Sequence, residues 1–282
     1  MKTKSKVIAI AAPTATGKTK LAIELAHKIN GEIISADSRL VYKGFEIAVA
    51  KPTIEEREGI PHYLIDVVEP EFDYSVANFC DDATKAINEI LAKNKTPIVV
   101  GGTGLYFRIL LEGLDLPRVE PNIELRKNLE EFSIEDLIIE LEKYDKNWSD
   151  RISTPDKRKL IRAIEICIGL GKPFSKVQSK KEVPYDVEWI GINMPRDEIY
   201  NRINKRVDKM VELGILEETK ALLKKHGRIP NFVKTIGYQE LLQYLDGEIS
   251  FDKAIELIKQ HSRNYAKRQL TWFRRNKALG IN

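Results

Sequence analysis

The segment that most constrains the fold is an apolar stretch followed by a glycine-containing loop and a helical pattern. KVIAIAA covers residues 6–12, and the loop PTATG separates it from KTKLAIELAHKI. In that last segment Leu21, Leu25 and Ile29 recur at helical spacing. A strand that turns into a helix through such a loop is the context that a phosphate-binding P-loop requires. The chain therefore predicts a strand–loop–helix unit with a sheet built around it.

Residues 12–19 match a relaxed P-loop pattern, with alanine where the common pattern has its first glycine. Backbone N–H groups of such a loop and the N-terminus of the following helix converge on phosphate oxygens, and the lysine adds a point charge. The threonine hydroxyl would reach Mg²⁺ bound to the phosphates. The alternative is a helix N-terminus that merely contains Gly-Lys-Thr. The predicted phosphate-binding residues are Ala12, Pro13, Thr14, Ala15, Thr16, Gly17, Lys18 and Thr19.

Four further stretches have the composition of strands, namely GEIISADS, HYLIDVVEP, TPIVVGG and VEWIGINMP. Helical patterns separate most of them, which indicates an α/β fold with a mainly parallel sheet. Ligands of such sheets bind beyond the carboxyl ends of the strands. The phosphate loop, Asp37 and residues 101–103 all follow strands, so we expect them at one pocket.

The pattern changes at Pro117. Residues 117–150 are acidic and helical, residues 151–181 are basic, and neither part has a strand pattern. This composition predicts an inserted all-helical subdomain at 117–181. The catalytic core is then expected at 1–116 and 182–282.

Bulk composition excludes several classes of protein. Net charge is +4 and 43% of the residues are hydrophobic, as in ordinary globular proteins. Cys80 and Cys167 lie far apart, which argues against a disulfide framework or a zinc site and favours a reducing cytoplasm. No stretch is long and apolar enough to span a bilayer, and the apolar run near the start is too short for a secretory signal.

Carboxylates near the predicted loop decide between hydrolysis and transfer. P-loop ATPases usually place an aspartate after an apolar strand to help hold Mg²⁺, but PIVV runs into Gly101-Gly102-Thr103. Asp66 could replace that acid, but a strand-end surface carboxylate is the preferred explanation. Asp37 ends another strand and could accept a proton from an attacking hydroxyl or amine, or it could cap a helix. A transferase with a diphosphate leaving group fits better than a hydrolase.

Seven stretches resemble the tRNA dimethylallyltransferases in order and spacing. They are APTATGKT, SADSRLVYKGFEIAVAKP, PHYLIDVVEP, IVVGGTGLYFRILLEG, RVDKMVELGILEE, TIGYQELLQYLDGEIS and AKRQLTWFRRN. The resemblance extends from about Val7 to Arg275. The chain departs from the family at Ala12, at Arg39-Leu40, where the family has glutamine, and at Ala48-Val49, where it has Gly-Thr.

The resemblance implies a P-loop NTPase-like fold and a nucleotide-binding (ATP-binding) type of loop. It implies transfer of a dimethylallyl group from dimethylallyl diphosphate to N6 of the adenine 3′-adjacent to the anticodon, in tRNAs that read codons beginning with U. Asp37 and Thr103 match the family's catalytic residues, and Arg206 matches a diphosphate ligand. Mg²⁺ held at Thr19 is the implied cofactor, and a cytoplasmic monomer the implied state.

The family's tRNA-contacting positions also match residues of this chain. A base in a stacked loop must be flipped out to be modified, and basic surfaces and aromatic groups hold the RNA. Solvated helix faces are the alternative for most of these lysines and arginines. The matching residues are Asp37, Ser38, Arg39, Leu40, Thr103, Arg126, Arg158, Lys159, Leu160, Ile161, Arg162, Lys234, Thr235, Ile236, Gly237, Tyr238, Gln239, Lys267, Arg268, Gln269, Leu270, Thr271, Trp272, Phe273 and Arg274.

Three other functions remain as alternatives at this point. An adenylate isopentenyltransferase that acts on free AMP, ADP or ATP would use the same loop and Asp37, but would not need the basic insertion. A small-molecule P-loop kinase would use Asp37 as a base for a hydroxyl and would consume ATP. An RNA-binding GTPase-like module would need a guanine-specific Asn-Lys-x-Asp motif, which the sequence lacks.

Overall fold

The computed structural model describes residues 4–149, 156–177 and 179–281. The chain forms two compact units. The core unit comprises Met1–Leu111 and Pro184–Asn282, and the second unit comprises Glu112–Val183. Within the described residues, no helix combines the length and the apolar character needed to cross a bilayer.

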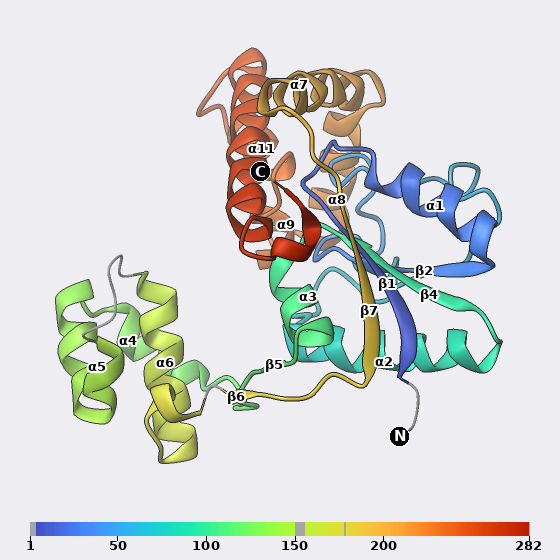
Figure 1. Ribbon diagram of the computed structural model, residues 1–282. Helices are drawn as coiled ribbons and strands as arrows, with labels where there is room; N and C mark the ends of the chain where they lie inside the picture. Colours follow the sequence, from blue (N-terminus) through green and yellow to red (C-terminus); the bar gives the residue numbers. More distant parts are fainter. Residues whose placement is uncertain (1–3, 150–155, 178, 282) are drawn as a thin grey trace. The chain divides into compact units, whose positions relative to one another are not determined.

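A five-stranded parallel sheet organises the core unit (Figure 1). The strand order is β3-β2-β4-β1-β7, which confirms the mainly parallel sheet expected from the sequence. The strands are β1 (Ser5–Ala11), β2 (Gly31–Ala36), β3 (His62–Tyr63), β4 (Thr96–Gly101) and β7 (Tyr185–Gly191). Because β1 and β2 both pair with β4, the phosphate loop and the segment after β2 emerge on either side of the end of β4.

Helices cover both faces of this sheet, and alternate strand residues face each layer. On one face Ile8, Ile33 and Ile98 pack against α1 (Lys18–Ile29). On the other, Ala9, Ile34 and Val99 pack in a larger core. Its helices include α2 (Val76–Ala92), α3 (Gly104–Leu111) and α11 (Phe251–Phe273).

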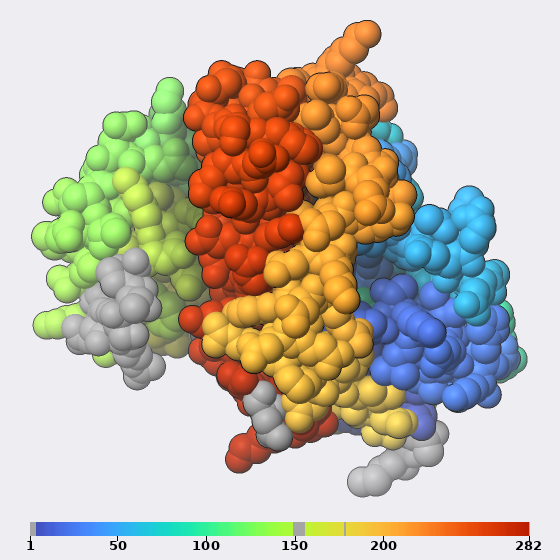
Figure 2. Space-filling view, turned by 90° about the horizontal axis from the view of Figure 1, so that it is seen from above, coloured from blue at the N-terminus to red at the C-terminus, as the bar shows by residue number. Residues whose placement is uncertain are grey.

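The C-terminal helices build a wall beside the sheet. They are α7 (Arg196–Glu212), α8 (Ile215–His226), α9 (Pro230–Val233), α10 (Tyr238–Leu245), α11 and the short 3₁₀ helix η2 (Lys277–Leu279). Helices α7 and α11 pack together, and Figure 2 shows both on one face of the core unit. Gly214, with φ +90°, separates α7 from α8, so residues 196–226 form two helices.

One predicted strand is much shorter than expected. The stretch HYLIDVVEP pairs with β2 only through His62 and Tyr63. Leu64 and Asp66 then adopt positive φ values of 63° and 57°, which extended strands do not tolerate. The strand-like composition of this stretch was therefore a poor guide to the length of the strand.

The second unit is mainly helical and has its own core. Its helices are α4 (Ile123–Glu130), α5 (Ile134–Ser149), α6 (Lys157–Leu170) and the 3₁₀ helix η1 (Phe174–Lys176). Leu137, Leu141, Leu160 and Ile164 are buried between them. Two short strands, β5 (Leu114–Asp115) and β6 (Ser179–Lys180), form an antiparallel pair that the sequence did not predict.

Close packing at the end of β4 explains why this strand has no acidic residue after it. A Cβ atom at Gly101 would overlap the carbonyl oxygen of Ala36 on β2. Any side chain there would push the two strands apart. The position at which P-loop ATPases often carry an aspartate is therefore sterically closed in this protein.

We predict that Gly101→Ala destabilises the protein by about 3 kcal/mol, because the methyl group cannot be accommodated between paired strands. Gly59→Ala is the matched control. Gly59 has φ +73° but no neighbouring atom within 4 Å, so only backbone strain of about 1 kcal/mol is expected. Urea unfolding measures both values. Equal losses in the two variants would contradict the steric explanation.

Candidate active site

A cavity of about 520 Å³ opens beyond the carboxyl ends of β1 and β2. Thr14 and Lys18 of the phosphate loop and Asp37 after β2 line one side. Helix α7 contributes Arg206, and helix α11 contributes Tyr265. The structure thus brings together the predicted loop, the predicted base and the predicted arginine, which are far apart in sequence.

The phosphate loop connects β1 to α1 without strain at its unusual alanine. Positive φ values occur at Ala15 (64°) and Gly17 (87°), whereas Ala12 is not among the positive-φ residues. The Thr16 hydroxyl donates to the carbonyl of Pro13 at 2.8 Å, which fixes the turn of the loop. Position 12 therefore does not require glycine here.

Two cations face one carboxylate inside the cavity. Desolvation lowers the pKa of Lys18 to about 8, while Asp37 acts in the opposite direction. Desolvation also lowers the pKa of Arg206. The Arg206 guanidinium donates to the Thr14 hydroxyl at 2.9 Å and to the Val49 carbonyl at 3.4 Å. This imbalance of charge favours binding of an anion, which would offset the cost of desolvating both cations.

Asp37 caps a turn and not a helix. Its Oδ1 accepts a hydrogen bond from the backbone N–H of Arg39 at 2.8 Å, and the following residues form turns. The helix-cap alternative is therefore wrong. Within the part of the chain that the structure describes, no group donates a hydrogen bond to the second carboxylate oxygen, so this oxygen can accept a proton from a ligand.

Two tyrosines close to Asp37 are neutral, and Thr103 also lies nearby. Burial raises the pKa of Tyr265 to about 12, and the charge of Asp37 acts in the same direction. Burial also raises the pKa of Tyr106, again with Asp37 as a further cause. The backbone N–H of Thr103 donates to the Ala36 carbonyl at 3.2 Å, which places Thr103 beside the end of β2.

Gln269 joins the phosphate loop to the end of β4. Its Oε1 accepts from the backbone N–H of Thr14 at 2.9 Å, and its Nε2 donates to the carbonyl of Gly102 at 2.9 Å. The side chain is 5% exposed. Gln269 matches a block expected to contact RNA, but its amide is already used for these two internal bonds.

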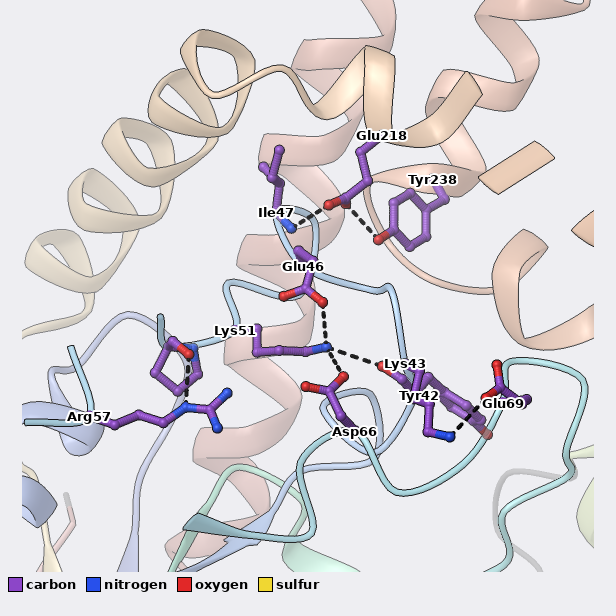
Figure 3. A network of polar contacts seen from close by, with 11 residues as sticks. Tyr42, Lys43, Glu46, Ile47, Lys51, Arg57, Asp66, Glu69, Glu218 and Tyr238 are labelled. Atoms are coloured by element: carbon purple, nitrogen blue, oxygen red, sulfur yellow. Dashed lines mark hydrogen bonds and ion pairs between the residues drawn. The ribbon is translucent and has the colours of Figure 1, made fainter. Parts of the chain in front are cut away.

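The segment 46–51, which we call the strap, forms another wall of the cavity and is fixed at both ends (Figure 3). At one end, Glu218 accepts from the backbone N–H of Ile47 at 2.8 Å and from the Tyr238 hydroxyl at 2.6 Å. At the other end, the buried Lys51 ammonium pairs with Glu46 at 2.8 Å and with Asp66. Asp66 is thus committed to this ion pair and does not line the cavity.

The predicted RNA-binding residues of the core unit fall into two groups. The first group is exposed or partly exposed, and the second is buried. Lys234, Gln239, Lys267, Arg268, Thr271 and Arg274 are exposed, and Ser38, Arg39, Leu40, Ile236 and Trp272 are partly so. Thr235, Gly237, Tyr238, Gln269, Leu270 and Phe273 are buried, and of these Thr235 and Gln269 line the cavity.

Sequence reasoning missed one face of α11. His261, Ser262 and Tyr265 line the cavity together with Arg268 and Gln269. Their spacing of three or four residues puts them on one side of the helix. That periodicity was visible in the sequence, but only the later residues matched a known block.

The predicted RNA-binding residues of the second unit also divide into buried or paired residues and exposed ones. Arg126 donates to the buried carboxylate of Glu165 at 2.7 and 2.8 Å, and Arg162 pairs with the same group. Leu160 and Ile161 are buried. Arg158 and Lys159 are exposed, so these two residues are accessible to a binding partner such as RNA.

Comparisons with known proteins agree with one another. The family model for IPP transferase matches residues 40–276. A tRNA dimethylallyltransferase of Thermomicrobium roseum is 44% identical, over 99% of this chain and 86% of that relative. One from Acetivibrio thermocellus is 46% identical, over 95% of this chain and 88% of the relative.

Solved structures give the same picture. The full-length tRNA isopentenylpyrophosphate transferase of Bacillus halodurans has a TM-score of 0.74 at 41% identity, with 99% of this chain and 90% of that chain covered. A eukaryotic dimethylallyltransferase acting on tRNA has a TM-score of 0.84 at 31% identity, with 95% and 70% covered.

We predict that Gln269→Leu lowers the free energy of unfolding by about 2–4 kcal/mol. The substitution leaves the Thr14 N–H and the Gly102 carbonyl without partners inside the protein. Lys267→Leu, on the exposed side of the same helix, should change stability by less than about 0.5 kcal/mol. Chemical denaturation distinguishes the two, and a neutral Gln269→Leu variant would show that the amide does not hold the loop.

We also predict that metal-free pyrophosphate binds more weakly above pH 8. The protonated ammonium of Lys18 attracts the anion, and its pKa of about 8 means that the charge is lost as the pH rises. At pH 9 the affinity should be about tenfold below that expected for a permanent cation. Lys18→Arg supplies the permanent cation and corrects for titration of pyrophosphate itself. A constant ratio of the two affinities from pH 7 to 9.5, measured by calorimetry, would contradict this.

Proposed function

The chain belongs to the IPP transferase family and transfers a dimethylallyl group to tRNA, and we propose that the acceptor is N6 of the adenine directly 3′ of the anticodon. The proposed donor is dimethylallyl diphosphate, and the proposed substrates are tRNAs that read codons beginning with U. The observation that carries the proposal is that Lys18, Arg206 and Asp37 line one cavity.

In the proposed reaction, some of these residues act on the attacking nitrogen and the others act on the departing diphosphate. N6 attacks the allylic carbon of the donor, a new C–N bond forms, and the bond between that carbon and the diphosphate oxygen breaks. Asp37 accepts the proton that N6 loses. Lys18, Arg206 and the backbone N–H groups of the loop stabilise the negative charge that develops on the departing diphosphate.

Mg²⁺ is the proposed cofactor. Among the described residues there is no cluster of three His, Cys, Asp or Glu side chains that could hold a metal ion alone. Mg²⁺ is commonly held by one or two protein groups together with substrate phosphates. We assign this role to the Thr19 hydroxyl, because Thr19 lines a cavity together with Lys18 and Asp37. When bound, the ion would neutralise charge on the diphosphate.

The target adenine has to leave its stacked loop to reach Asp37, at a cost of a few kcal/mol. Exposed basic residues near the cavity, including Lys234 and Arg268, can contact RNA phosphates, and these contacts would offset the cost of flipping the base. We extend the proposed tRNA surface to Arg158 and Lys159 of the second unit. The two free cysteines, Cys80 and Cys167, fit a cytoplasmic protein, and we propose that it acts as a monomer.

The primary test is incubation of the protein with labelled dimethylallyl diphosphate, Mg²⁺ and unmodified tRNA, with AMP and ATP as acceptors in parallel. We expect label at N6 of the adenine next to the anticodon. Label only in free nucleotide would instead support an adenylate isopentenyltransferase. Consumption of ATP without transfer of label would support a kinase.

We predict that Asp37→Asn lowers turnover by about 10²–10⁴-fold, because only proton acceptance is lost. The affinity for tRNA should remain within about twofold of the wild-type value on the same argument. Asp73→Asn, at an exposed position outside the cavity, is the control and should retain full turnover. Normal turnover of Asp37→Asn would exclude Asp37 as the base.

We predict that the double substitution Arg158→Ala, Lys159→Ala weakens tRNA binding and reduces its salt dependence. Each lost phosphate contact should reduce the slope of log K against log salt concentration by about 0.7–0.9. Lys28→Ala, at an exposed position on α1, is the control. If the double variant keeps the wild-type slope in filter-binding titrations, these two residues do not contact tRNA.

A further inference from the structure

Two residues that carry unsatisfied polar atoms line one small cavity beside the phosphate loop. In the part of the chain that the structure describes, only three buried side-chain polar atoms have no hydrogen-bond partner. Two of them, Ser35 Oγ and His62 Nε2, belong to residues that line a cavity of about 80 Å³. Lys18, Thr19 and Asp37 line the same cavity.

Ser35 is held there by the sheet. It lies on β2, opposite Val100 of β4, and is 4% exposed. Residues alternate along a strand, so Ser35 faces the same side as Ile33, which packs against α1. A buried hydroxyl without a partner costs free energy. This cost indicates that the hydroxyl is used when the site is filled.

His62, which lines the same cavity, carries a second acceptor. Its Nδ1 lies 2.8 Å from the carbonyl oxygen of Ile60, which can only accept, so the proton is on Nδ1. Nε2 is therefore an unprotonated acceptor. Burial lowers the pKa of His62, which keeps the ring neutral. The pairing of His62 with Ile33 of β2 fixes its position next to Ser35.

These acceptors suit a hydrated cation. Mg²⁺ usually keeps several water molecules when it binds with substrate phosphates. Water molecules bound to a dication donate strongly and need acceptors around them. A neutral imidazole nitrogen, a hydroxyl oxygen and a carboxylate are acceptors of this kind, and the cavity has room for a few water molecules.

We propose that Ser35 and His62 accept hydrogen bonds from water molecules of the Mg²⁺ that accompanies the diphosphate at Thr19. The proposal rests on the proposed function, since that function supplies the diphosphate. It also explains how Mg²⁺ could be held without an acidic residue after β4, where the position of Gly101 has no room for a side chain. The neighbouring strands β2 and β3 supply neutral acceptors in its place.

The test measures the affinity for inorganic pyrophosphate with and without Mg²⁺, by calorimetry. We expect the wild-type protein to bind more tightly with Mg²⁺. In the double variant Ser35→Ala, His62→Phe, we expect about tenfold or more of that gain to be lost, as for other outer ligands of metal sites. The affinity measured in EDTA should not change.

Three further variants separate this role from a structural one. Ser35→Ala alone should leave the unfolding free energy of the ligand-free protein unchanged or higher, because it removes an unsatisfied hydroxyl. His62→Gln keeps an acceptor and should restore part of the metal-dependent gain. His226→Phe is the control, since the side chain of His226 is 7% exposed and pairs with Glu71 outside the cavity.

The outcomes are distinct. A full metal-dependent gain in the double variant, or no gain in the wild-type protein, would overturn the proposal while leaving the diphosphate site intact. Equal loss of affinity with and without Mg²⁺ would also overturn it, because the residues would then shape the pocket and not serve the metal. Absence of any pyrophosphate binding by the wild-type protein would instead contradict the proposed function.

Discussion

The amide of Gln269 is the interaction on which the arrangement of the site depends. It links the phosphate loop to the residue after β4 and thereby fixes α11 against the carboxyl ends of the strands. Because Thr14 contributes a backbone N–H and Gly102 a backbone carbonyl, the link needs one side chain that both accepts and donates, as an amide does. Helix α11 then supplies the cavity wall that the sheet alone lacks.

The sequence was sufficient to predict the sheet and the ligand-binding end of it. The P-loop spacing and the strand-like stretches are local signals, and β1, β2, β4 and β7 lie close to where they were expected. Local signals failed at β3, where positive φ values at Leu64 and Asp66 end the strand early. They also gave no sign that Gln269, Leu270 and Phe273 are buried within a block that resembles an RNA-binding surface, because burial depends on contacts distant in sequence.

The desolvated cations and the unsatisfied acceptors indicate that the site is preorganised for its ligand. Lys18 and Arg206 lose solvation without an equal number of carboxylates nearby, and Ser35 and His62 keep polar atoms without partners. Each of these features costs free energy in the ligand-free protein. A bound ligand would provide partners for these groups and so remove the cost. Occupancy of the site should therefore stabilise the folded chain.

The antiparallel pair of β5 and β6 has a consequence for how the chain accommodates a second unit. The pair brings the start and the end of the Glu112–Val183 segment next to each other. The inserted segment therefore leaves and re-enters the core unit at two neighbouring points, as the arms of a short hairpin do. Closing a long flexible loop at this position would cost more entropy. A segment attached in this way can change its length or surface among relatives with little effect on the register of the sheet.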